Sequence, residues 1–315
     1  MKKQLSIATV AAALVALLLP ALGCSPEKGA TKQEGKKIVK IAYLPITHAL
    51  PVFEVKEELE ASNDELQVEL VKYGSWPELL DALNTGRVDG ASVLIELAMR
   101  AKEQGVGLSV VALGHKDGNV VVAAKEIGSA KELKGKRFAI PHRQSSHNIL
   151  LNDALETVGL TVADVEVVEM APPEMPSALA SGQIAGYCVA EPFGAKAVTI
   201  GVGKALLTSE ELWSNSLCCG LALNDGFITE RPEDAAKFVQ SYKAAGKNLD
   251  KARAKEIAKT YLQQDDETLD VSLQWISYDD LDVTPEIYAD LVERVKKYGL
   301  SENPPTYEEF VKADL

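Results

Sequence analysis

The chain has 315 residues, of which 46% are apolar and 25% are charged, and its formal net charge at pH 7 is −13. This length and composition suit a soluble globular protein with one large core or two moderate ones. The acidic balance and the lack of any block of lysine or arginine exclude the usual electrostatic signature of a nucleic-acid or anionic-membrane binder.

The amino terminus has the pattern of an export signal. A basic start is followed by an apolar run from Leu5 to Leu22 and by small residues before Cys24. This pattern predicts a signal peptide over residues 1–23, with a short transmembrane anchor as the alternative. The sequence Ala21-Leu22-Gly23-Cys24 resembles a bacterial lipoprotein cleavage box, which predicts lipidation of Cys24 and a polar linker over residues 24–37. A freely secreted protein is the alternative.

Three cysteines follow Cys24, namely Cys188, Cys218 and Cys219. Adjacent cysteines rarely bridge each other, so the one ordinary disulfide available joins Cys188 to Cys218 or Cys219. The alternative is that all three are small buried apolar residues. No C-x-x-C or H-x-x-x-H spacing occurs, so the sequence predicts neither a metal site nor a cofactor.

Short apolar runs then alternate with helical patterns, which predicts an α/β fold with mostly parallel sheets. The first strands are expected at residues 38–44, 66–71, 88–93 and 108–113, with helices at 47–60, 77–86 and 95–104. Ser75 and Glu78 have the spacing of a capping box before the second of these helices. A strand at residues 120–124 is expected to cross into a second lobe.

The second lobe repeats this scheme. Strands are expected at residues 138–140, 165–170, 184–189 and 204–208, and helices at 146–158, 173–181 and 191–200. A strand at 219–223 should return to the first lobe. Four helices should follow and pack on that lobe to brace the hinge, at 233–249, 252–262, 266–275 and 285–298.

Two segments 96 residues apart are similar to each other. Residues 77–90, PELLDALNTGRVDG, align with residues 173–186, PEMPSALASGQIAG. The same offset places Lys40 on Lys136 and Pro45 on Pro141, so the pattern predicts a duplicated α/β unit and a cleft between two lobes. We expect a discontinuous first lobe, residues 38–119 and 222–315, and a second lobe of residues 120–221.

Helix starts at the carboxyl ends of the strands supply the candidate ligand-binding residues. Their free N–H groups and dipoles favour an anion. The candidates are Thr47, His48, Ser75, Trp76, Gln144, Ser145, Ser146, His147, Pro173 and Glu191. Plain structural roles are the alternative: helix caps for Ser75 and Ser146, a core position for Trp76, a surface position for His147, and a helix start for Glu191. A stacking surface for a ring is a further possibility, formed by Tyr43, Phe53, Trp76, Tyr187, Phe193 and Trp213.

Four stretches together resemble the periplasmic substrate-binding proteins of ABC importers, in the nitrate, sulfonate, taurine and bicarbonate group that shares a domain with thiamine-pyrimidine binders. They are YLPITHALPVF, SWPELLDALNTGRVDGA, LKGKRFAIPHRQSSHNILLNDALETVGL and PPEMPSALASGQIAGYCVAEPFGAKA. The resemblance implies a type II periplasmic-binding-protein fold that closes on its ligand. In nitrate- and bicarbonate-type relatives the positions of Trp76, His147 and Pro173 line the site, and sulfonate-type relatives use a helix start like Ser145-Ser146. Residues 216–219 lack the charged residue of nitrate-type relatives, which argues against nitrate itself.

The expected function is therefore solute binding without catalysis. We expect a monomeric, exported and lipid-anchored receptor, in the periplasm or on the outer face of the cytoplasmic membrane, that delivers a small polar anion to an ABC permease and its ATPase. Neither nucleic acid nor a further membrane contact is expected. The alternatives are a receptor for a thiamine precursor or other small heterocycle, an enzyme like those of pyrimidine synthesis, and an extracellular sensor domain.

Overall fold

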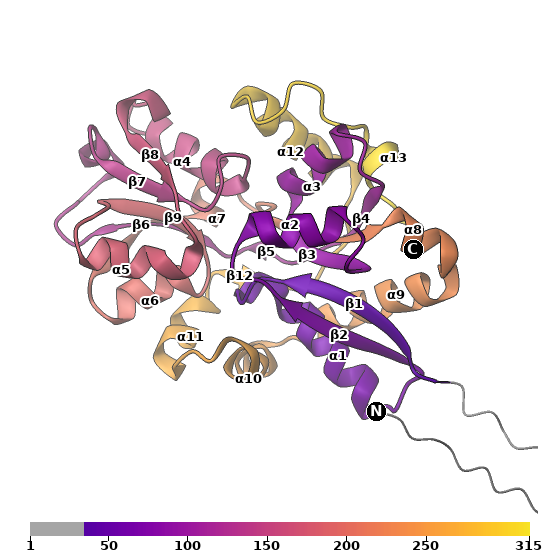
Figure 1. Cartoon of the computed structure of the whole chain (residues 1–315). Coiled ribbons are helices and arrows are strands. Elements are labelled where there is room, and N and C mark those ends of the chain that lie inside the picture. The colour runs from indigo at the N-terminus through magenta and orange to yellow at the C-terminus, as the bar shows by residue number, and fades with distance from the viewer. Residues whose placement is uncertain (1–34) are drawn as a thin grey trace, which may run out of the picture. The chain divides into compact units, whose positions relative to one another are not determined.

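The computed structural model describes residues 35–315 and contains two five-stranded sheets, as Figure 1 shows. The predicted signal peptide, Cys24 and most of the predicted linker lie outside the described residues. Within residues 35–315, no helix is both long enough and apolar enough to cross a membrane.

The first sheet has the strand order β2-β1-β3-β11-β4. Its strands are β1 (Lys37–Tyr43), β2 (Leu66–Lys72), β3 (Gly90–Leu94), β4 (Leu108–Leu113) and β11 (Cys219–Asn224). Strands β2 and β3 pair with β1 in parallel, whereas β11 pairs antiparallel with both β3 and β4. Only the returning strand β11 therefore runs against the other four.

The second sheet has the corresponding order, β8-β7-β9-β6-β10 when it is read from the equivalent edge. Its strands are β6 (Asn119–Ala124), β7 (Arg137–Ile140), β8 (Glu166–Glu169), β9 (Gly186–Ala190) and β10 (Gly203–Thr208). Here the crossing strand β6 is the reversed one. The predicted α/β class with mostly parallel sheets is confirmed.

The 96-residue repeat is visible in the backbone. Strands β3 and β9 are both five residues long, and they begin at Gly90 and Gly186. A Cβ atom at Gly90 would lie 2.7 Å from the carbonyl oxygen of Ala222 in β11, and one at Gly186 would lie 2.7 Å from that of Val122 in β6. Glycine is needed at both positions because the reversed strand passes so close.

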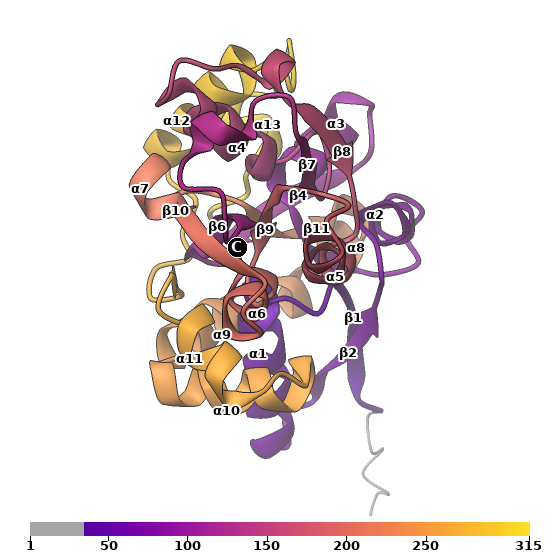
Figure 2. The same ribbon diagram turned by 90° about the vertical axis from the view of Figure 1, so that its left-hand side faces the viewer.

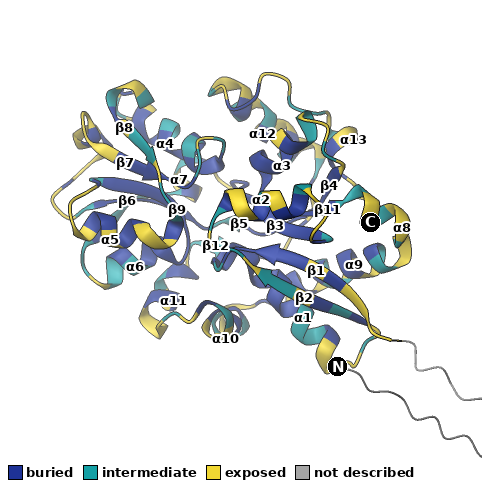
Figure 3. Ribbon diagram, viewed as in Figure 1, coloured by how far each residue is buried: buried dark blue, intermediate teal, exposed yellow. Residues whose placement is uncertain are grey.

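Helices cover the faces of both sheets. Around the first sheet lie α1 (Leu50–Ala61), α2 (Trp76–Asn84) and α3 (Ile95–Glu103), and around the second lie α4 (Ser146–Glu156), α5 (Met175–Ala180) and α6 (Phe193–Thr199). The helix expected at residues 47–60 is a 3-10 turn, Thr47–Ala49, followed by α1. Figure 3 shows the strands buried and the outer faces of the helices exposed, which is the pattern of a layered α/β fold.

The C-terminal segment is helical, as expected, and it contacts helices that cover the first sheet as well as a helix that covers the second. It contains α8 (Asp225–Glu230), α9 (Pro232–Asn248), α10 (Lys251–Leu262), α11 (Asp266–Ser272), α12 (Pro285–Lys297) and α13 (Tyr307–Phe310). Helices α9 and α10 pack on α1, whereas α11 packs on α6 of the second sheet. Helices α10 and α11 lie side by side in both views (Figures 1 and 2). Helices α9 and α10 thus pack beside the first sheet, as expected, and the contact of α11 with the second sheet's layer is an addition that was not predicted.

Among the elements that were not predicted are three short ones, and two of them, β5 (Lys116–Asp117) and α7 (Ser209–Leu212), lie at the crossings between the sheets. Strand β5 pairs antiparallel with β12 (Ile276–Ser277), and α7 follows β10. Two-residue strands and single-turn helices carry too little periodicity to be recognised in a sequence.

We propose that the two sheets are the centres of two lobes, called lobe 1 and lobe 2 below. Strand β6 begins at Asn119, which agrees with the expected crossing. Strand β11 belongs to the first sheet from Cys219 onward, so the proposed return to lobe 1 falls three residues before the expected boundary at 222.

The six aromatic residues considered for a stacking surface are distributed through the core instead. Phe53 stacks on Tyr261, with ring centroids 4.5 Å apart and planes at 9°. The Tyr187 hydroxyl donates a hydrogen bond to the Phe193 carbonyl, and Trp213 lies against Arg294. Tyr43 and Phe53 belong to one buried apolar cluster and the other four rings to another, so the six do not form one surface for a ligand ring.

Candidate functional site

Polar side chains meet where the strands of the first sheet have their carboxyl ends. His48 follows β1 and His115 follows β4. Cys218 and Cys219 stand at the start of β11, which runs in the opposite direction and therefore begins at the same edge. This edge is where α/β sheets place their ligands.

These four residues form a compact cluster of possible metal donors. His48, His115, Cys218 and Cys219 are all buried, and one donor atom from each lies within 4.8 Å of the other three. The Cys219 Sγ atom is 3.5 Å from His48 Nδ1 and 3.9 Å from Cys218 Sγ. The three described cysteines are free, so no disulfide competes for these thiols.

Neighbouring groups orient the two histidines. The Nε2 atom of His48 lies 2.9 Å from the carbonyl oxygen of Gly118, which accepts a hydrogen bond from its N–H, and Nδ1 faces Cys219. The backbone N–H of Cys219 donates to Nε2 of His115 at 3.3 Å. The two imidazole rings lie 3.5 Å apart at 31°.

The burial of the cluster sets its protonation. Burial, with the neighbouring His48 ring, lowers the pKa of His115 to about 4, so this imidazole is neutral at neutral pH. Burial also opposes ionisation of Cys218, but the hydrogen bond from Cys219 and the nearby His147 and His48 rings hold the pKa of Cys218 well below its usual range. Burial and the adjacent Cys218 raise the pKa of Cys219. His115 is therefore in the neutral form that can bind a metal ion, and the surroundings of Cys218 favour ionisation of its thiol.

Residues at the start of α4 in lobe 2 cover the cluster. The Nε2 atom of His147 is 4.0 Å from Cys218 Sγ. The Nδ1 atom of His147 and the Oγ atom of Ser146 are buried without a hydrogen-bond partner within residues 35–315. On the lobe 1 side, both carboxylate oxygens of Glu96 are likewise buried and unpartnered in the described chain, and burial raises the pKa of this group well above its usual value.

Thr47 and Glu191 connect the two lobes rather than presenting polar groups to a solute. The Thr47 amide and hydroxyl both donate to the Glu191 carbonyl oxygen, at 2.8 and 2.9 Å. The Glu191 carboxylate accepts from the Ala195 amide at 3.2 Å, at the start of α6. Burial, opposed by that amide, raises the pKa of Glu191 to about 8.

Of the other predicted residues, Ser145 and Trp76 are buried and Ser75 and Gln144 are half-buried. The Ser145 hydroxyl donates to the His142 carbonyl oxygen at 2.6 Å, and Gln144 Nε2 donates to the Leu300 carbonyl oxygen at 3.4 Å. Ser75 precedes α2 without a side-chain cap, so the predicted capping box with Glu78 does not form. Trp76 is 2% exposed and belongs to the main core, with its Nε1 atom unpartnered among the described residues.

Pro173 is exposed and lies apart from the donor cluster. It lines a cavity of about 540 Å³ between the lobes, mostly with apolar neighbours. These are Leu44, Pro45, Ile46, Tyr73, Gly74, Pro172, Phe193 and Leu262, with Lys72 and Gln264 as the polar members. The cavity opens between the lobes, but few of its lining groups could recognise a polar solute.

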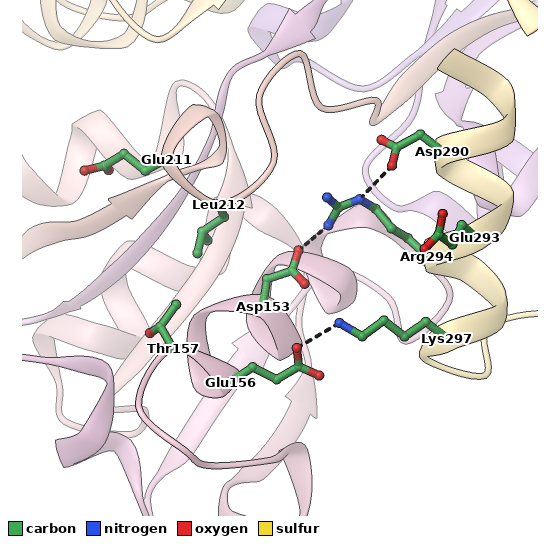
Figure 4. A pocket seen from close by; sticks show the side chains of 9 residues that line it. All are labelled: Asp153, Glu156, Thr157, Glu211, Leu212, Asp290, Glu293, Arg294 and Lys297. Atoms are coloured by element: carbon green, nitrogen blue, oxygen red, sulfur yellow. Dashed lines mark hydrogen bonds and ion pairs between the residues drawn. The ribbon is translucent and has the colours of Figure 1, made fainter. Parts of the chain in front are cut away.

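A charged cavity of about 390 Å³ separates α4 from α12 and is shown in Figure 4. The Arg294 guanidinium forms salt bridges with the carboxylates of Asp153 and Asp290, with N–O distances of 2.7 and 3.4 Å. The Lys297 ammonium forms one with the Glu156 carboxylate at 2.8 Å. Because these charges pair with one another, the cavity is a structural contact between lobe 2 and the C-terminal helices.

His48 and His147 were predicted from the sequence as site residues, but the donor cluster as a unit was not. Its members are separated by up to 171 residues, and only the fold brings His48 and Cys219 together. The one signal was the Cys218-Cys219 pair at the predicted returning strand, opposite a histidine at the end of the first strand.

Comparison with known proteins identifies the family. The NMT1-like family model matches residues 32–262. The nitrate/nitrite binding protein NrtA of Nostoc is 26% identical over 242 residues, 69% of this chain and 55% of that protein. The taurine-binding periplasmic protein of Escherichia coli is 31% identical over 175 residues, 54% of this chain and 53% of that protein. The matches thus span about half the length of these curated relatives.

Among solved structures, the ligand-binding component of an ABC-type import system from Staphylococcus aureus, solved with zinc bound, is similar over most of its length. It is 38% identical, with 88% of this chain and 97% of that chain covered, and the TM-score is 0.85. The chain therefore belongs to the NMT1-like family, is related to the nitrate-, sulfonate- and taurine-binding proteins of ABC importers, and has the periplasmic-binding-protein fold.

Proposed function

We propose that this protein is the substrate-binding component of an ABC importer and that it encloses a small solute between its two lobes. The observation that carries the proposal is the set of buried, unpartnered polar atoms at the facing edges of the lobes, on Glu96, His115, Ser146 and His147. Native proteins pair nearly all buried polar groups, so their concentration at one place favours a solute-binding site.

The proposed mechanism is binding followed by closure, without catalysis. Thr47 of lobe 1 and Glu191 of lobe 2 are hydrogen-bonded across the interface, so the structure supports a closed arrangement. A solute that contacts both lobes stabilises this arrangement by its greater affinity for it. The closed protein would then deliver the solute to a membrane permease, and a separate ATPase would drive transport.

We also propose that the protein is exported and lipid-anchored through Cys24, as a monomer. The basis is the signal-like segment before Cys24, together with relatives whose names place them in the periplasm. A thiamine precursor, an enzymatic role and a sensor role remain the alternatives.

The relatives leave two classes of solute open. The names of NrtA and of the taurine-binding protein favour a small polar anion, and the start of α4 supplies buried donors for one through Ser146 and His147. The Staphylococcus aureus protein, in contrast, was solved with a zinc ion.

A thermal-unfolding screen of the purified, chelator-treated protein tests solute capture. The panel is ZnCl₂, nitrate, bicarbonate, taurine, an alkanesulfonate and the thiamine pyrimidine. A solute at a hundred times its dissociation constant should stabilise the protein by about 2.7 kcal/mol. The stabilisation should shrink in His147→Asn, at the site, and persist in His142→Asn, outside it. No stabilisation by any member would contradict the proposed function.

A further inference from the structure

We propose that the solute is a single divalent transition-metal ion, Zn²⁺ foremost, held by His48, His115, Cys218 and Cys219. This inference rests on the proposed function, because it names the solute for the same interlobe site. Two imidazole nitrogens and two thiolate sulfurs are a donor set that selects zinc over calcium or magnesium.

Two of the distances between donor atoms match those of a tetrahedral zinc site. Zinc lies about 2.3 Å from sulfur and about 2.0 Å from nitrogen, so in a tetrahedron two sulfurs stand about 3.8 Å apart and a sulfur and a nitrogen about 3.5 Å apart. The distance between Cys218 Sγ and Cys219 Sγ is 3.9 Å, and that between Cys219 Sγ and His48 Nδ1 is 3.5 Å. Little movement would be needed to coordinate one ion.

The second interaction of His48 has the arrangement typical of metal ligands. A histidine that binds a metal through one nitrogen usually donates its other N–H to a carbonyl or carboxylate, which fixes the tautomer. His48 makes this contact with the Gly118 carbonyl oxygen at 2.9 Å. The Nε2 atom of His115 accepts the Cys219 amide at 3.3 Å, and its Nδ1 atom is buried with no hydrogen-bond partner in residues 35–315, so His115 would bind an ion only after its tautomer changes or that hydrogen bond is given up.

The electrostatics of the site favour a cation over an anion. No lysine or arginine is buried within the described chain. Two thiolates would neutralise the charge of one Zn²⁺ ion. An anion enclosed there would have no buried lysine or arginine to balance its charge.

The short distances within the cluster also favour a single metal ion over a polyatomic anion. The donor atoms all lie within 4.8 Å of one another. Two groups that hydrogen-bond opposite oxygens of a nitrate or sulfonate must stand roughly 6 Å or more apart, because each bond is about 2.9 Å long. In this closed arrangement the space between the four donor residues can hold a single metal ion but not a polyatomic anion.

The position of the cluster suits a transported ion. The four donors lie at the edge of the first sheet, and His147 and Ser146 of lobe 2 cover them. Because all four donor residues are fully buried, an ion can enter or leave only when the lobes separate. Lobe 1 would bind the ion first, and lobe 2 would then enclose it.

A metal titration with matched variants tests the inference. The chelator-treated protein is titrated with Zn²⁺ against a chromophoric chelator, and with Co²⁺ as a probe whose absorption reports thiolate coordination. The test variants are Cys219→Ala and His48→Gln. The controls are Cys188→Ala and His142→Gln, a buried cysteine and a half-buried histidine outside the cluster. Circular dichroism verifies that each variant is folded.

We expect one equivalent of Zn²⁺ on the wild type and on both controls, and affinity lower by about 100-fold or more in both test variants. The wild-type Co²⁺ spectrum should show thiolate-to-metal charge transfer, a readout that does not depend on any variant folding. Zinc binding that survives in both test variants would overturn the assignment. If Zn²⁺ fails to bind while nitrate or taurine stabilises the protein, the metal site is contradicted and the proposed solute binding is still supported. If no solute binds, both the metal site and the proposed function are contradicted.

Discussion

Replacing Glu191 by glutamine should raise the free energy of unfolding at pH 9 by roughly 4 kcal/mol. Burial raises the pKa of Glu191 from 4.5 to about 8, so the folded protein keeps a proton that the unfolded chain releases at lower pH. Wild-type stability should therefore fall as the pH rises from about 4.5 to about 8, and it should level off above that. Glutamine cannot ionise and should remove this loss.

Urea unfolding of the metal-free protein between pH 5 and pH 9 measures the effect. The same substitution at the exposed residue Glu126 is the control and should leave the wild-type pH dependence in place. Equal pH dependence in Glu191→Gln and the wild type would show that the Glu191 carboxylate titrates normally in the folded protein.

Trp76→Ala should lower the free energy of unfolding of the unliganded protein by about 3–5 kcal/mol. Trp76 is the first residue of α2, and its indole is 2% exposed and packs in the main core. The substitution therefore removes a large buried side chain and leaves a cavity. Denaturant unfolding checks this value. A loss below about 1 kcal/mol would instead place Trp76 on the wall of the solute site.

Trp76→Phe separates packing from hydrogen bonding at the same position. Phenylalanine keeps an aromatic ring in the core but removes the Nε1–H group, which has no partner in the described part of the chain. It should cost clearly less stability than alanine. If Trp76→Phe were as destabilising as Trp76→Ala, the indole N–H would have a structural partner that the present account lacks.

Most of the fold was predictable because it depends on local patterns. Apolar runs of three to seven residues marked the strands of both sheets, and the expected strand at 108–113 agrees with β4 in both bounds. The repeated glycines of the two similar segments are explained by the reversed strands beside Gly90 and Gly186. Contacts between distant elements, such as α11 on α6, have no local pattern, and they were missed.

The candidate site was predicted only in part, for a related reason. The rule that helix starts at strand ends face a cleft found His48, Ser146 and His147. It could not find His115, which follows a strand without opening a helix, or the Cys218-Cys219 pair, which begins a reversed strand. The same rule predicted Trp76 as a ligand-binding residue, whereas its side chain packs in the main core. A sequence does not show on which side of a helix start the core lies.

Small-angle X-ray scattering during a zinc titration tests most directly whether the two lobes close on a solute. The metal-free protein should have a larger radius of gyration than the protein with one equivalent of Zn²⁺, because the buried donors can take up the ion only after the lobes separate. The radius should fall in proportion to the zinc bound. Saturation with zinc and no change in scattering would contradict a solute-driven closure of the lobes.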